Sequence, residues 1–71
     1  MRYAVVIEKG ASNYGAYVPD LPGCVAVGDF RRQVLKLIRE GLRLHIRAMR
    51  KAGESIPTPT SRSEIVKVRA A

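Results

Sequence analysis

The chain has 71 residues, 46% of them hydrophobic, and its 13 Lys and Arg residues against 6 Asp and Glu residues give a formal net charge of +7. A chain this short forms one domain near the lower limit at which a single core is self-sufficient, so we expect one domain, residues 1–71, that associates as a homodimer or higher oligomer. The apolar content excludes a disordered chain. The single cysteine excludes an internal disulfide, and no apolar run approaches the roughly 18 residues of a membrane span, so we expect a soluble cytoplasmic protein.

The positive charge is concentrated on one stretch of the chain. Residues 31–51 contain eight Lys and Arg residues and a single acidic residue, Glu40, for a local net charge of +7. The remaining residues are close to neutral. This asymmetry bears on the choice of binding partner and not on the fold.

Three short strands are expected in the first half of the chain. Residues 2–9 are β-branched and aromatic, and because both faces are mostly apolar we expect this strand to lie in the centre of the sheet. Residues 10–13 have turn composition, residues 14–19 form a second strand, and residues 24–27 form a third. Sequential strands with short links predict an antiparallel meander.

A long amphipathic helix follows, from about Phe30 to Ala52, with Asp29 as its N-cap or the residue before it. Gly53 is placed to end the helix in a left-handed conformation. The apolar arc of the helix, expected to cover one face of the sheet, contains Leu37, Leu44, Ala48, Gly41, Val34, His45, Ile38, Met49, Leu42, Leu35 and Ile46. Residues 64–69 resemble a final strand. The predicted fold is therefore α+β, in the order β-β-β-α-β, with a small antiparallel sheet covered on one face by a single long helix.

The connection between the second and third strands has a structural interpretation. It reads Asp20-Leu21-Pro22-Gly23-Cys24, in which proline fixes φ and glycine accepts conformations that other residues avoid. Cys24 is expected to be a small buried hydrophobe. A nucleophilic cysteine would need a base, and the only histidine, His45, lies in the apolar arc of the helix.

Catalytic and cofactor sites are not expected. One cysteine and one histidine are too few for a zinc site, and the carboxylates do not cluster as a two-metal nuclease requires. No glycine-rich phosphate loop is present. The sequence therefore predicts no enzyme, no metal and no cofactor.

The basic helix face is the strongest candidate for a binding surface. Like-charge neighbours four residues apart, such as Arg39 and Arg43, are each unfavourable by roughly 0.2–0.5 kcal/mol. Arginine also suits bidentate contacts with phosphates and carboxylates. Nucleic acid, an acidic protein surface and a merely solvated face remain open as interpretations. The candidate residues for an anionic partner are Arg32, Lys36, Arg39, Arg43, Arg47 and Arg50.

The chain resembles the HicB-like antitoxin family. The similarity rests on the Asp20–Cys24 turn, on Gly28-Asp29, on Leu44-His45 in the helix and on the Gly53–Pro57 exit. The resemblance implies a truncated ribonuclease-H-like fold without nuclease carboxylates. It also implies a protein that binds a HicA-type toxin, a small RNA-cleaving protein, and covers its active site.

Two features of the sequence differ from the usual pattern of the family. Family members usually carry a further DNA-binding segment, and residues 61–71 are too few for one, so we expect no separate DNA-binding domain. The helix opens with Phe30-Arg31-Arg32, and a toxin that binds RNA is itself expected to be basic. The helix therefore either faces away from such a toxin or serves another partner, and direct nucleic-acid binding by the basic face is the alternative function.

Overall fold

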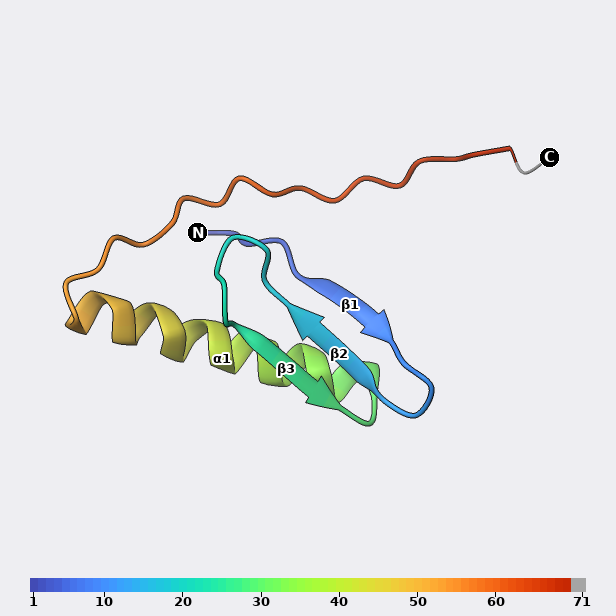
Figure 1. Cartoon of the computed structure of the whole chain (residues 1–71), viewed down its shortest axis with the longest axis horizontal. Helices are drawn as coiled ribbons and strands as arrows, with labels where there is room; N and C mark the ends of the chain where they lie inside the picture. The colour runs from blue at the N-terminus through green and yellow to red at the C-terminus, as the bar shows by residue number, and fades with distance from the viewer. Residues whose placement is uncertain (70–71) are drawn as a thin grey trace.

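The computed structural model describes residues 1–69, and it contains three strands followed by one long helix (Figure 1). The strands are β1 (Val6–Lys9), β2 (Tyr14–Tyr17) and β3 (Val25–Gly28), and the helix is α1 (Arg31–Lys51). This confirms the α+β class, the antiparallel sheet and the single long helix. Each predicted element is present within a few residues of its expected bounds, apart from the final strand.

The sheet is antiparallel throughout, in the order β1-β2-β3. The expectation of a central first strand is wrong, because β2 is central and pairs through Tyr17 with both Val6 and Val25. The aromatic and apolar residues that suggested a central strand, Tyr3 and Val5, precede β1. They pack against the core as half-buried side chains without joining the sheet.

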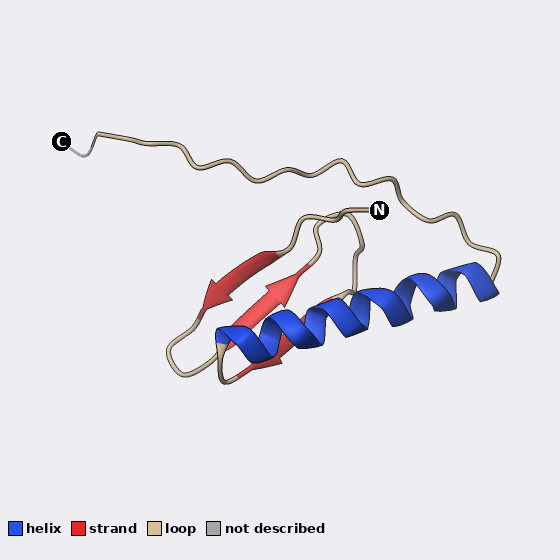
Figure 2. Cartoon of the chain, turned by 180° about the vertical axis from the view of Figure 1, so that it is seen from behind, coloured by secondary structure: helices blue, strands red, loops and turns tan. Residues whose placement is uncertain are grey.

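Two layers form the core, since α1 lies across one face of the sheet and contacts β2 and β3 (Figure 2). The register places Ile7, Ala16 and Ala26 side by side, and all three pack in the core beneath the helix. The fully buried residues are Ala16, Val18, Leu21, Cys24, Val34 and Ile38. Within residues 1–69, no second layer covers the opposite face of the sheet.

Backbone hydrogen bonds define both ends of α1. Phe30 is the N-cap without a side-chain cap, and the backbone N–H of Asp29, the residue before it, donates to Oε1 of Gln33 at 2.8 Å. At the other end Glu54 N–H donates to the Met49 carbonyl at 2.9 Å, and Gly53, at φ 71°, takes the predicted left-handed conformation. This is a Schellman motif, and it turns the chain back toward the sheet.

Beyond the helix the chain is extended but unpaired. Residues 54–61, hereafter the strap, run back past the N-terminal residues, and the Tyr3 hydroxyl donates to the Pro57 carbonyl (Figure 1). Residues 62–69, hereafter the tail, were expected to contain a strand at 64–69, and this is wrong because no ladder forms there. Ile65, Val66 and Val68 are largely exposed, so the β-type alternation of the tail has no partner within the described chain.

Candidate functional site

The six predicted cations form one line along α1. The basic ridge is Arg32, Lys36, Arg39, Arg43, Arg47 and Arg50, all exposed. Successive members are three or four residues apart, so at about 100° per residue they share one side of the helix and extend about 27 Å along it. The structure thus places on one side of α1 every residue that the sequence analysis proposed for binding an anionic partner.

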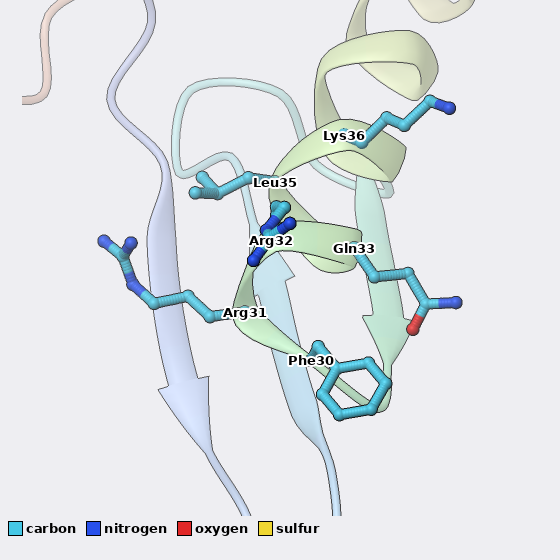
Figure 3. Close-up of a pocket in the computed structure, with 6 residues that line it drawn as sticks. All are labelled: Phe30, Arg31, Arg32, Gln33, Leu35 and Lys36. Carbon is cyan, nitrogen blue, oxygen red and sulfur yellow. The ribbon is translucent and has the colours of Figure 1, made fainter.

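The N-terminal end of the ridge borders an open hollow of about 930 Å³ (Figure 3). Phe30 and Leu35 supply apolar surface, and Arg31, Arg32 and Lys36 supply positive charge. No acidic residue lies in the first turn of α1, where the helix dipole favours one. The hollow therefore adds to the positive potential of the ridge at the end where the dipole has the same sign.

The Asp20–Cys24 turn connects β2 to β3 and contributes two side chains to the core. Leu21 and Cys24 are buried, and Gly23 takes a positive φ of 87°. The backbone N–H groups of Leu21 and Cys24 donate to the carbonyls of Val18 and Leu21, each at 3.1 Å. Burial raises the pKa of the Cys24 thiol, which is opposite to the lowered pKa that a nucleophilic cysteine needs.

Asp20 has a role that the sequence did not reveal. Its carboxylate accepts hydrogen bonds from the backbone N–H and the hydroxyl of both Thr60 and Ser61, at 2.9–3.0 Å. The Ser61 N–H contributes most to lowering the pKa of Asp20 from 3.8 to about 2, and the four hydrogen bonds together outweigh desolvation, which acts in the opposite direction. This clasp fixes the strap to the turn. The partners are 40 and 41 residues away in sequence, so no local pattern could have predicted it.

The remaining titratable groups do not suggest a metal centre. Within residues 1–69, no three His, Cys, Asp or Glu side chains come close enough to hold a metal ion. His45 is half-buried on α1. No helix in this part of the chain is long and apolar enough to cross a membrane.

Two apolar surfaces are exposed, one on the sheet and one on a part of the helix that was expected to cover the sheet. On the uncovered face of the sheet Val25 is 67% and Val27 63% exposed, beside Tyr17. On α1 Leu37 is 40% and Leu44 62% exposed, although both belong to the predicted apolar arc. The three strands have four residues each, and they cover only part of the predicted arc of eleven residues.

The sequence was compared with known families, and residues 3–70 match the family described as the HicB_like antitoxin of bacterial toxin-antitoxin systems. The chain belongs to the HicB-like antitoxin family. The resemblance carried by the Asp20–Cys24 turn and the Gly53–Pro57 exit is thereby confirmed. An antitoxin-type role follows from this membership, while the partner is not identified by it.

Individual relatives agree with the family assignment. The HicB-like chain is 38% identical over 58 residues to UPF0150 protein Ta0767 of Thermoplasma acidophilum, covering 80% of this chain and 84% of that protein. It is 35% identical over 57 residues to an uncharacterized 14.9 kDa protein of Haemophilus phage HP1, covering 80% of this chain but only 43% of the phage protein. A UPF0150 protein of Helicobacter pylori is 42% identical over 41 residues, which cover 58% of this chain and 57% of that protein. No solved structure gave a significant match.

Proposed function

We propose that this HicB-like domain is the antitoxin component of a type II toxin-antitoxin system, and that it acts in the cytoplasm by binding a HicA-type RNA-cleaving toxin and occluding its active site. The observation that carries the proposal is the family match over residues 3–70. The domain acts without catalysis of its own. Two observations support this. The raised pKa of Cys24 keeps its thiol protonated, and the carboxylate of Asp20 is occupied by hydrogen bonds to Thr60 and Ser61.

The uncovered face of the sheet is the surface on which we place the toxin. Val25, Val27 and Tyr17 are exposed there, and the one charged side chain that the strand alternation adds is acidic, Glu8. A basic toxin meets no repulsion on this face, whereas the ridge on the other side of the molecule would repel it. The apolar side chains also provide the desolvated centre that a stable protein interface needs.

Coexpression tests this proposal. The wild-type domain is expected to restore growth of cells that express a HicA-type toxin encoded beside it, and the Val25→Lys/Val27→Lys double variant is expected to lose this protection. The matched control is Val66→Lys/Val68→Lys, which places the same charges on exposed valines of the tail. Equal protection by all three proteins would contradict the assigned surface, and no protection by any of them would contradict the antitoxin role.

A second candidate function is direct binding of nucleic acid by the basic ridge. The observation in its favour is the single line of six exposed cations beside a first turn that has no acidic residue. Binding to duplex DNA would weaken as salt is added. A plot of the logarithm of the binding constant against the logarithm of the salt concentration would fall with a slope of about −0.9 for each phosphate neutralised. Arg43→Glu/Arg47→Glu in the middle of the ridge would abolish it. Against this candidate, the exposed aromatic ring of Phe30 lies only at the N-terminal end of the ridge, and no aromatic side chain alternates with the cations along α1 to stack on successive bases.

A further inference from the structure

One side of α1 carries an apolar line that the fold leaves uncovered. We call it the seam: Leu37, Gly41, Leu44 and Ala48. Leu37 and Leu44 are exposed to 40% and 62%, and Ala48 is exposed as well. The core is built from a different part of the helix, in which Val34 and Ile38 are buried and Leu42, Ile46 and Met49 pack against them. The seam therefore contributes little to the stability of the domain.

The spacing of the seam is that of a helix–helix contact. Its residues follow one another at intervals of four, three and four, with leucines alternating with small residues. This is the repeat by which a second helix lays its side chains between those of the first. Nothing lies within 4 Å of where a Cβ atom on Gly41 would be, so the space above Gly41 is open. A partner helix can approach the backbone closely at this point.

Charge decides what kind of helix fits. At about 100° per residue, the cations nearest the seam are Lys36 and Arg47 of the basic ridge and also Lys51, on the flank of α1 that carries Glu40, the only acidic residue on the helix. A second copy of α1 would bring an identical row of cations against this one. An amphipathic helix with acidic residues beside its apolar stripe would instead place carboxylates against Lys36, Arg47 and Lys51, and arginine binds carboxylates in a bidentate manner.

We propose that the seam and the cations beside it, Lys36, Arg47 and Lys51, form a docking site for an acidic amphipathic helix of another protein. The site lies on a different surface from the uncovered sheet face, so it does not rest on the proposed toxin contact. It accounts for two features at once, the exposed leucines and the excess of cations on the flank beside them. Apolar contact gives the site its register along the helix, and the arginines give it selectivity for acidic partners.

The test uses a fluorescent synthetic helical peptide of the length of α1, 21 residues, with Leu and Ala on one stripe and Glu on both sides of it. Its binding to the wild-type domain is followed by anisotropy. Replacing every Glu of the peptide by Gln is expected to weaken binding at least about tenfold, and raising the salt concentration is expected to weaken binding of the Glu peptide.

Two substitutions at one position test the close approach. Gly41→Leu fills the open space above the helix and is expected to weaken peptide binding at least about tenfold, while the matched control Gly41→Ala binds within about threefold of wild type. Both replacements raise helix propensity, so both proteins are expected to melt at or above the wild-type temperature. Loss of binding through misfolding is thus distinguished from loss through obstruction. Leu44→Gln is a second disrupting variant, and Val66→Gln in the tail is its control.

Three results would overturn the proposal. Equal binding of the peptide by wild type, Gly41→Leu and Leu44→Gln would mean that only the ridge attracts it. A single-stranded RNA oligonucleotide that binds more tightly than the peptide and is insensitive to Leu44→Gln would assign the ridge to nucleic acid. A wild-type dimer that Leu44→Gln converts into a monomer would assign the seam to a second copy of the chain. The Val25→Lys/Val27→Lys variant is expected to bind the peptide normally, which separates this site from the toxin surface.

Discussion

Asp20 is bound by residues far from it in the sequence. It accepts two hydrogen bonds each from Thr60 and Ser61, and through them a turn between two strands holds the chain segment that follows the helix. The hydrogen bonds favour the ionised carboxylate, which is why its pKa is lowered to about 2. The attachment of the strap is therefore coupled to the charge of one side chain.

A pH titration tests this coupling. Because the pKa of Asp20 is lower in the folded than in the unfolded chain, its contribution to stability is complete above about pH 4 and is lost as the pH falls toward about 2. Asp20→Asn removes the titrating group. We expect wild type to be more stable than Asp20→Asn at pH 6 and the difference to vanish near pH 2, measured by urea unfolding at each pH. A difference that does not depend on pH would show that the carboxylate is not the group that titrates.

Leu21, beside Asp20, packs the turn against the core. Its side chain is buried, so Leu21→Ala is expected to cost about 2–5 kcal/mol of unfolding free energy through lost contacts and a cavity. Leu44→Ala makes the same chemical change on the exposed seam and is expected to cost less than about 1 kcal/mol. Chemical denaturation of both variants makes the comparison, and similar losses would mean that Leu44 is also part of the core.

At the scale of elements, the periodicity of the sequence predicted α1 to within one residue at each end, and Gly53 predicted its termination. The periodicity could not predict which part of the apolar arc the sheet covers, because that depends on the number and length of the strands. The same limit applies to β1 and to the tail. The β-branched residues in Ile65-Val66-Lys67-Val68 favour an extended conformation. A strand forms there only if the free edge of a sheet lies beside it, and a local sequence pattern carries no information about the position of that edge.

The elements also limit how much of the candidate site could be foreseen. The six ridge residues were predicted in full, since a helical repeat alone places them on one side. The exposure of the seam and of the uncovered sheet face was not predicted. Both consist of apolar residues in the pattern of a buried surface, and the sequence does not show that no other element packs over them. The clasp was missed because its donors and its acceptor are far apart in sequence.

The like charges of the ridge lead to a prediction about α1 itself. Arg43 has Arg39 and Arg47 four residues away on either side and Glu40 three residues before it. Arg43→Glu therefore converts two repulsive pairs into attractive ones and one attractive pair into a repulsive one, and the net change is expected to stabilise the domain by about 0.5–1 kcal/mol. Glu40→Arg is the matched opposite change, since it replaces the only acid on the helix and is expected to destabilise. Unfolding at low salt and at high salt makes the measurement, and both effects are expected to shrink at high salt. A loss of stability in Arg43→Glu would contradict the repulsion assigned to the ridge.

At the scale of the whole molecule, a domain with six fully buried residues is expected to gain stability by association. Exposed sheet edges and the helix flank near Leu35 and Ile46 are the candidate surfaces for this association. Ile46 packs against the core, and the strap runs past the residues that precede β1, so β3 is the more open edge. Val18 N–H donates to the Cys24 carbonyl, and because antiparallel bonding alternates, the backbone groups of Val25 and Val27 point away from β2.

We therefore expect the 7.8 kDa chain to sediment as a dimer at micromolar concentration, with the β3 strands of two copies paired. Val27→Pro removes an outward N–H and is expected to yield a monomer that is still folded, because proline is tolerated at an edge strand. Val66→Pro in the tail is the control and is expected to remain a dimer. Monomeric wild type at high concentration would contradict the association, and a dimeric Val27→Pro variant would contradict the β3 contact.

The clasp between Asp20 and the strap also sets a boundary for proteases. The strap contains no Lys or Arg, whereas Arg62, Lys67 and Arg69 lie in the exposed tail just beyond it. Trypsin needs several residues in an extended, accessible conformation, which the tail offers and α1 does not. Brief digestion is therefore expected to trim the protein after Arg62 and leave a stable fragment of residues 1–62, readable by mass spectrometry. In Asp20→Asn the strap is released, and cleavage is expected to continue into the end of the helix at Lys51.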